Sequence, residues 1–162
     1  MNTSDLHPVE PPTSRRPRAT VWRFLAATLC LGVHGCSDPT GGAVELSWAL
    51  RDTQRDPVGD CAAGRIARIR LSWDDGATPG SQSFRCDANH GVTAFDVPTG
   101  AVALSIAPEC QDGALADPGS YLAPPPIVRD VSLGQAVTLD ALQLIVRVAP
   151  AECTSQPCVC VR

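Results

Sequence analysis

Apolar and polar residues alternate with a period of two along most of the chain after residue 42. In the segment 44–50, valine, leucine and tryptophan alternate with glutamate, serine and alanine, and the segment 67–73 repeats the pattern around arginines. This spacing predicts half-buried strands, because successive side chains of a strand point to opposite faces of a sheet. Between Leu139 and Leu142 the apolar positions shift phase, which predicts a β-bulge. The pattern predicts seven short strands, in the segments 44–50, 67–73, 81–86, 93–97, 102–106, 127–133 and 136–149.

Turn-forming residues separate these segments. Glycine, proline, aspartate and asparagine gather in 74–80, 87–91 and 98–100, and no segment has a helical period. Short strands separated by turns predict an all-β domain, an antiparallel seven-stranded β-sandwich over residues 43–149. Aromatic residues are few, so the core is expected to consist mainly of valine, leucine and isoleucine. Its largest members are expected to be Trp48, Trp73, Phe84 and Phe95.

The first 35 residues have the composition of a signal peptide. Arginines precede an apolar run over residues 24–35. A transmembrane helix needs about 20 apolar residues, so this run is too short to remain as an anchor but suits the core of a signal peptide. The alternative is a buried helix of the domain, which the arginines before the run and the Gly/Ser/Pro-rich stretch after it disfavour. We therefore expect residues 1–35 to be removed on export.

The apolar run ends in Val33-His34-Gly35-Cys36, which resembles the bacterial lipobox. The resemblance implies a lipoprotein that is cleaved before Cys36 and carries fatty acyl chains, such as palmitate, on that cysteine. Several acyl chains make membrane attachment stable. Ser37, rather than aspartate, follows the cysteine, which by resemblance to known sorting rules favours the outer membrane, on its periplasmic or surface face. Residues 36–42 would then form the anchor and a short tether, and we call this segment the tether.

Cysteine usage predicts a disulfide framework. Cys30 leaves with the signal peptide and Cys36 takes lipid, so an even number remains in an exported chain, which allows fifteen pairings. The remaining cysteines are Cys61, Cys86, Cys110, Cys153, Cys158 and Cys160. Three of them lie in a Cys-rich tail, residues 150–162, where a metal site is the rival interpretation. That tail lacks the C-x2-C spacing of zinc sites and has no histidine nearby, so we expect no metal there.

Strand direction predicts that all six cysteines lie at one end of the sandwich. Successive strands reverse direction, so positions before the second strand and after the third, fifth and seventh share the end where the first strand finishes. The tether precedes the first strand and lies at the opposite end. We expect Cys86 to pair with Cys61 or Cys110, and the tail cysteines to take the rest. The segments at the distal end, which we call the cap, are 52–64, 87–91, 109–126 and 150–162.

The net charge and the motifs of the chain argue against several classes of function. Nine arginines and fifteen acidic residues follow Cys36, a formal net charge of −6, which gives no attraction to nucleic acid. His90 is the only histidine after Cys36 and lies in a turn without a nucleophile motif, and the aspartates of 74–75 fit no calcium loop. Arg68 and Arg70 share one strand face and are expected to pair with neighbouring acids. No catalytic residue and no cofactor are predicted.

The stretch Phe95-Asp-Val-Pro-Thr-Gly-Ala-Val-Ala-Leu-Ser-Ile106 is similar to prealbumin-like, or carboxypeptidase-regulatory-like, β-sandwich modules. In those modules an aromatic residue, a Pro-x-Gly turn and an alternating strand follow one another. The resemblance implies a binding or structural role. We therefore expect a non-enzymatic envelope module that binds a protein or a glycan through its loops. The alternative is a small envelope enzyme, hydrolytic or thiol-redox, with its site in the same loops. Candidate binding residues are Asp87, Asn89, His90, Asp112 and Tyr121.

Overall fold

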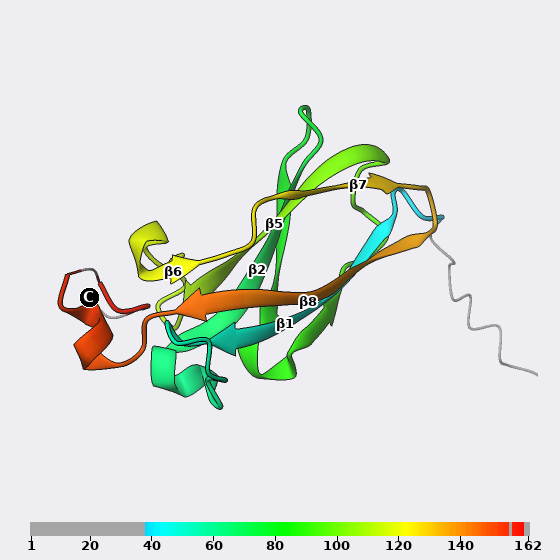
Figure 1. Cartoon of the computed structure of the whole chain (residues 1–162). Helices are drawn as coiled ribbons and strands as arrows, with labels where there is room; N and C mark the ends of the chain where they lie inside the picture. The colour runs from blue at the N-terminus through cyan, green and yellow to red at the C-terminus, as the bar shows by residue number, and fades with distance from the viewer. Residues whose placement is uncertain (1–37, 156, 161–162) are drawn as a thin grey trace, which may run out of the picture. The chain divides into compact units, whose positions relative to one another are not determined.

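Eight strands form two four-stranded sheets within residues 38–155 and 157–160, the part of the chain that the computed structural model describes (Figure 1). One sheet has the order β4-β1-β8-β6 and the other the order β3-β2-β5-β7. The strands are β1 (Ala43–Arg51), β2 (Ile66–Asp74), β3 (Gly80–Arg85), β4 (His90–Val92), β5 (Gly100–Cys110), β6 (Tyr121–Leu122), β7 (Ile127–Val131) and β8 (Ala136–Val146). Short 3-10 helices span Cys61–Gly64, Cys86–Ala88, Pro118–Ser120 and Pro150–Cys153. This arrangement confirms the predicted all-β sandwich.

The chain divides by its internal contacts into the units Met1–Cys36 and Ser37–Arg162, and the sandwich belongs to the second. The predicted cleavage site and Cys36 lie outside the described residues. In the described part of the chain no helix has the length and apolarity needed to cross a membrane.

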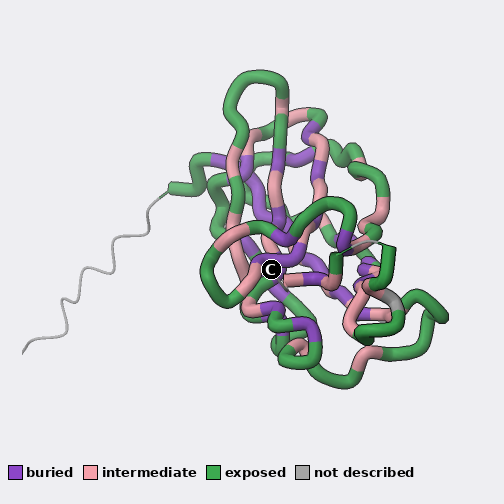
Figure 2. The backbone as a smooth tube through the Cα atoms, turned by 90° about the vertical axis from the view of Figure 1, so that its left-hand side faces the viewer, coloured by how far each residue is buried: buried purple, intermediate pink, exposed green. Residues whose placement is uncertain are grey.

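The core lies between the two sheets, and its members come from the alternating positions of the strands (Figure 2). Trp48 is 3% exposed and Trp73 8% exposed, and Phe84 packs on this core with its ring centroid 6.2 Å from that of Trp48. Phe95 is 45% exposed, so its predicted place in the core is wrong. The largest fully buried side chains are Leu46, Ile69, Leu71, Leu104, Leu139 and Leu144.

The two sheets are antiparallel except at one pair: β1 and β8 run parallel, with Ala43 opposite Ala136 and Arg51 opposite Ile145. Reversal at each pass explains this exception, because the first and the last pass of an odd number run in the same direction. The register between them shifts where Leu46 pairs with Leu139 and Trp48 pairs with Leu142, which confirms the predicted bulge.

The extra strand is β6, which lies inside the predicted loop 109–126. β6 pairs with β8, and the chain then continues in the same direction, through three prolines, into β7 of the other sheet. The two short strands are therefore one pass that changes sheets, so the eighth strand leaves the alternation of directions intact.

The predicted strand 93–97 is wrong: β4 spans His90–Val92, begins inside the predicted turn 87–91 and ends before Thr93. The backbone N–H of Val44 donates to the Thr93 hydroxyl oxygen at 2.9 Å instead of to a backbone carbonyl. Thr93 N–H still donates to Val44 O at 3.0 Å, and the ladder resumes only as a bridge between Gly42 and Val97. A side chain that replaces a backbone acceptor thus interrupts the regular strand.

The last residues of the tether are hydrogen-bonded to the sandwich. Gly41 N–H donates to Phe95 O and Gly42 N–H donates to Val97 O, both at 2.9 Å. The backbones approach so closely that a Cβ atom at position 41 would lie 2.1 Å from Val97 O. Only glycine allows this approach.

Gly41→Ala is therefore expected to lower the free energy of unfolding by about 1–3 kcal/mol, the usual cost of forcing extra atoms into a packed site. Chemical denaturation of the two proteins measures the difference. Gly59→Ala is the matched control, because a Cβ atom at position 59 has no neighbour within 4 Å. Equal stability of the two variants would contradict the described approach.

Candidate functional site

Three disulfides confirm the predicted framework at the cap. Cys61 pairs with Cys86, Cys110 with Cys160 and Cys153 with Cys158, with Cα–Cα distances of 6.1, 5.3 and 5.1 Å. Cys61 precedes β2, and Cys110 lies opposite Ile66, the first residue of β2. The cysteines therefore gather at the end where β1 finishes, opposite to the end where β1 begins. The thiols of the tail are held as disulfides rather than as free metal ligands.

The Cys61–Cys86 disulfide joins one half of the cap. Asp87 and Asn89 follow Cys86 and border, with Asp60 and Cys61, a small hollow of about 150 Å³. Arg85 binds Asp87 through two hydrogen bonds, of 3.0 and 2.5 Å, and these hold the pKa of the Asp87 carboxyl below its ordinary value. Both side chains of this ion pair are largely exposed. The negative charge at Asp87 is thus already matched by an arginine.

The Cys110–Cys160 disulfide joins the other half of the cap. Asp112 accepts a hydrogen bond from Ala114 N–H at 3.0 Å, a typical role of aspartate in a turn. Tyr121 begins β6 and is half-buried, and desolvation raises the pKa of its hydroxyl. A separate hollow of about 340 Å³ lies between the loop and the tail, lined by Cys110, Leu115, Ala116, Asp117, Pro157, Cys158 and Cys160.

His90 belongs to the cap segment 87–91, but its side chain contacts β1. It starts β4, on the sheet face, where its Nε2 atom lies 3.0 Å from Glu45 Oε1 of β1. Of the five candidate binding residues, the structure brings Asp87 and Asn89 together: Asn89 Nδ2 donates to Asp87 O at 3.4 Å. Among the described residues, neither hollow that Asp87 borders is lined by Asp112 or Tyr121. The five candidate binding residues are thus distributed over several surfaces.

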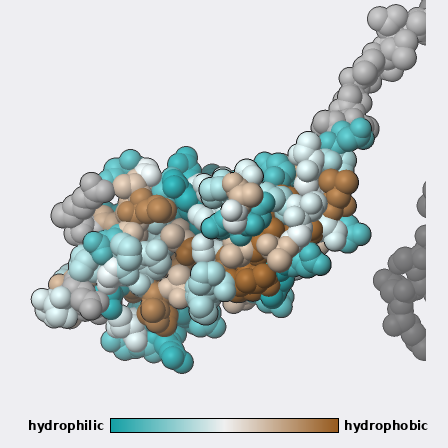
Figure 3. Space-filling model, turned by 90° about the horizontal axis from the view of Figure 1, so that it is seen from above, coloured by the Kyte–Doolittle hydropathy of each residue, from teal (hydrophilic) through white to brown (hydrophobic). Residues whose placement is uncertain are grey.

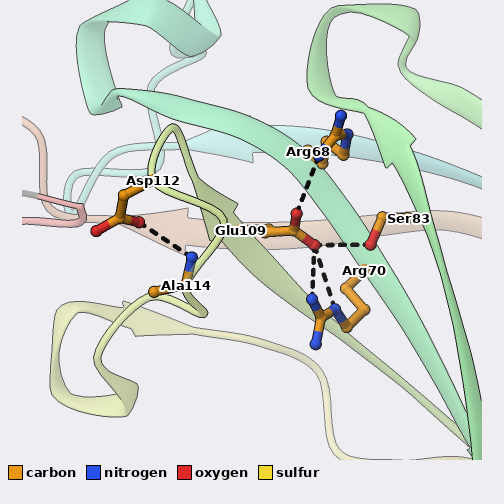
Figure 4. Close-up of polar contacts among 6 residues, drawn as sticks. All are labelled: Arg68, Arg70, Ser83, Glu109, Asp112 and Ala114. Atoms are coloured by element: carbon orange, nitrogen blue, oxygen red, sulfur yellow. Dashed lines mark hydrogen bonds and ion pairs between the residues drawn. The ribbon is translucent and has the colours of Figure 1, made fainter.

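A buried carboxylate, Glu109, forms the densest polar cluster near the cap (Figure 4). Arg68 Nη1 donates to Glu109 Oε1 at 3.2 Å. Arg70 donates to Oε2 through Nε at 3.2 Å and through Nη2 at 2.9 Å, and Ser83 Oγ donates to the same oxygen at 2.7 Å. The glutamate side chain is 5% exposed, while the Arg68 and Arg70 side chains are 54% and 31% exposed. The cluster thus joins β3, β2 and β5 on the outer face of one sheet.

These contacts determine what Glu109 can do chemically. The hydrogen bond from Ser83, together with those from Arg70 and Arg68, holds the pKa of Glu109 below its ordinary value of 4.5, against a desolvation effect that raises it. A carboxylate of low pKa with four donors is a weak base. The cluster therefore stabilises the sheet and does not have the arrangement of a general base next to an activated nucleophile.

The pairing of Arg68 and Arg70 with a neighbouring acid is confirmed, but the sequence did not identify Glu109 as a buried residue. Alternation from Val102 to Ile106 predicts that position 109 faces outward. Burial arises because the chain doubles back after β5: Ala116 N–H donates to Pro108 O at 2.9 Å, and Leu115 forms a bridge with Glu109. The usable signal was a lone glutamate beside a disulfide cysteine, opposite two arginines.

An open groove of about 530 Å³ adjoins this cluster on the same sheet face. Arg70 lies at its border, and hydroxyls of three serines line it together with apolar side chains. Such a surface can donate and accept hydrogen bonds between the Arg70 guanidinium, which is already paired with Glu109, and the Asp74 carboxylate. The lining residues are Arg70, Ser72, Trp73, Asp74, Pro79, Gly80, Ser81, Ala103, Ser105, Leu115 and Pro126.

Comparisons with known proteins identify no relative of this chain. No family model matches the chain, and no curated protein or solved structure matches it. In the part of the chain that the structure describes, no three His, Cys, Asp or Glu side chains are grouped to hold a metal ion.

Glu109→Gln is expected to lower the free energy of unfolding by about 1–3 kcal/mol at neutral pH, a value below that of a fully buried pair because both arginines retain contact with water. The folded pKa of Glu109 is lowered, so its charge stabilises the fold above the ordinary glutamate pKa. That stabilisation is lost as pH falls through the folded pKa.

Urea denaturation from about pH 7 to pH 3 measures both effects. Glu109→Gln should flatten the acid-side decline in stability, while Asp140→Asn, at an exposed position of β8, should leave it unchanged. A Glu109→Gln protein with the wild-type pH profile would show that the cluster contributes nothing.

The three disulfides are expected to differ in their resistance to reduction. Cys153–Cys158 closes a loop with a sequence separation of 5, against 25 for Cys61–Cys86 and 50 for Cys110–Cys160. Short loops constrain the unfolded chain least. Cys86 is also 1% exposed. Graded treatment with dithiothreitol, followed by alkylation and peptide mass spectrometry, should therefore find Cys153 and Cys158 labelled first; earlier labelling of Cys86 would contradict this order.

Proposed function

We propose that this chain is an exported, lipid-anchored protein of the bacterial cell envelope that acts as a non-enzymatic binding or structural module. The observation that supports this function best is that the six cysteines after Cys36 form three disulfides, all at the end of the sandwich opposite to the tether. Export to an oxidising compartment accounts for the disulfides, and an anchor before the tether would leave the disulfide-bonded end remote from the membrane.

The disulfides favour an oxidising compartment. Structural disulfides persist in the periplasm and on cell surfaces, whereas the cytosol keeps thiols reduced. The segment before Cys36 provides the means of reaching such a compartment, because its arginines and short apolar run have the order of a signal peptide. The disulfides and the signal-like segment lie in different parts of the chain and support the same localisation. Ser37, the residue after Cys36, favours the outer membrane within the cell envelope.

The arrangement of the sandwich favours binding at the cap. Ala43 pairs with Ala136 where β8 begins, and Arg51, eight residues further along β1, pairs with Ile145. At about 3.3 Å per residue, the cap therefore lies about 26 Å from the tether end. A lipid on Cys36 would direct the cap away from the membrane. Loops on a rigid scaffold commonly carry binding sites, and the resemblance of residues 95–106 to prealbumin-like modules agrees with recognition of a protein or glycan.

Metabolic labelling with an alkyne analogue of palmitate tests the anchor. The wild-type chain should incorporate the label and lose its first 35 residues, and Cys36→Ser should lose the label and accumulate as the longer precursor. Cys30→Ser is the matched control, because this cysteine lies within the removed segment and should leave labelling unchanged. An unlabelled wild-type chain that keeps residues 1–35 would refute the proposed function.

A further inference from the structure

Two large apolar side chains are exposed at the tether end of the sandwich. Phe95 is 45% exposed and Leu133 is 60% exposed. Figure 3 shows apolar surface at the end of the body where the described chain begins. Exposed aromatic and aliphatic side chains that gather at one end of a domain indicate a surface that contacts a protein or a membrane.

Gly41 brings the loops that carry these side chains to the tether. Its N–H donates to Phe95 O at 2.9 Å, and its carbonyl accepts from Gly134 N–H at 2.9 Å. Phe95 and Leu133, the neighbour of Gly134, therefore flank the segment through which the tether enters β1. The same end has an open hollow of about 580 Å³, lined by Asp38, Pro39, Thr40, Ala94, Phe95, Asp96 and Gly134.

The length of the tether limits the distance between Cys36 and the exposed side chains of Phe95 and Leu133. Thr40 Oγ1 donates to Phe95 O at 3.4 Å, so the chain is in contact with the sandwich from residue 40 onward. Four peptide units separate Thr40 from Cys36, and these span at most about 14 Å. A lipid on Cys36 would thus hold Phe95 and Leu133 within reach of the headgroup region.

We propose that Phe95 and Leu133 insert into the interface of the membrane that carries the acylated Cys36, so that the sandwich stands on the bilayer in one orientation. This inference rests on the proposed lipid anchor. The partner is a zwitterionic lipid surface, because Asp38 and Asp96 line the same hollow and would be repelled by anionic lipid. The attraction is apolar and is therefore expected to be insensitive to salt.

Tryptophan fluorescence of the purified mature lipoprotein, which begins at Cys36, tests the insertion. The Phe95→Trp and Leu133→Trp variants are reconstituted into vesicles of phosphatidylethanolamine and phosphatidylcholine, with or without bromine on the phosphatidylcholine acyl chains. The native Trp48 and Trp73 are buried, so they supply a constant background. Each new tryptophan should shift its emission to shorter wavelength and lose intensity with brominated lipid.

Leu122→Trp is the matched control. Leu122 is 65% exposed on β6 and pairs with Ile145, at the cap end of β8. Its emission should be unchanged by brominated lipid. If the protein floats with the vesicles but none of the new tryptophans is quenched, the inference fails and the anchor stands. If the protein does not float with the vesicles, the anchor itself fails.

A second copy of the chain is the other occupant that the experiment can identify. If the emission of Phe95→Trp in detergent changes with protein concentration, and brominated lipid has no effect, this end is an interface between copies and the membrane contact is refuted. A change that depends on brominated lipid alone supports the membrane contact.

Discussion

The reversal of chain direction at each pass across the sandwich is the constraint on which the rest of this structure depends. It makes β1 and β8 parallel neighbours and places the last residues of the tether and the cap at opposite ends of the sandwich. It also brings six cysteines that are distant in sequence close enough to pair, with Cα–Cα distances of 5.1–6.1 Å. One additional reversal between Cys61 and Cys86 would have placed them at opposite ends. The continuation of β6 into β7 without a reversal preserves the arrangement.

Disulfides and a polar cluster supplement a core that is built mainly from aliphatic side chains. Cys61–Cys86 and Cys110–Cys160 each close a loop long enough to constrain the unfolded chain appreciably. Glu109 joins three neighbouring strands from outside the core, through two arginines and Ser83. Both kinds of contact lie at the cap end of the sheet β3-β2-β5-β7. In the proposed binding role, restraint of the cap loops would reduce the conformational entropy lost on binding.

The fold was largely predictable from the period-two pattern, whereas the fine positions were not. Alternation identified β1, β2 and β5, and the phase shift after Leu139 identified the bulge in β8. β6 has only two residues, too few for a period to be visible. β4 ends where the Thr93 hydroxyl takes a backbone hydrogen bond, a tertiary contact that no local pattern reveals.

The candidate site was predictable only in part, for a related reason. The cysteines could be assigned because strand direction alone decides which end they occupy. Burial of Glu109 and exposure of Phe95 both depend on how a loop folds back, over β5 in one case and beside Gly41 in the other. Loop paths follow from tertiary hydrogen bonds, and sequence alternation carries no information on them.

We propose that the chain is exported, acylated at Cys36 and held by three disulfides at the cap. Mass spectrometry of the protein purified from its native membrane, intact and after non-reducing digestion, tests it most directly. The account predicts an N-terminal residue 36 carrying acyl chains, and cystine peptides that join Cys61 to Cys86, Cys110 to Cys160 and Cys153 to Cys158. Free thiols at these positions, or an unacylated chain that retains its first residues, would contradict it.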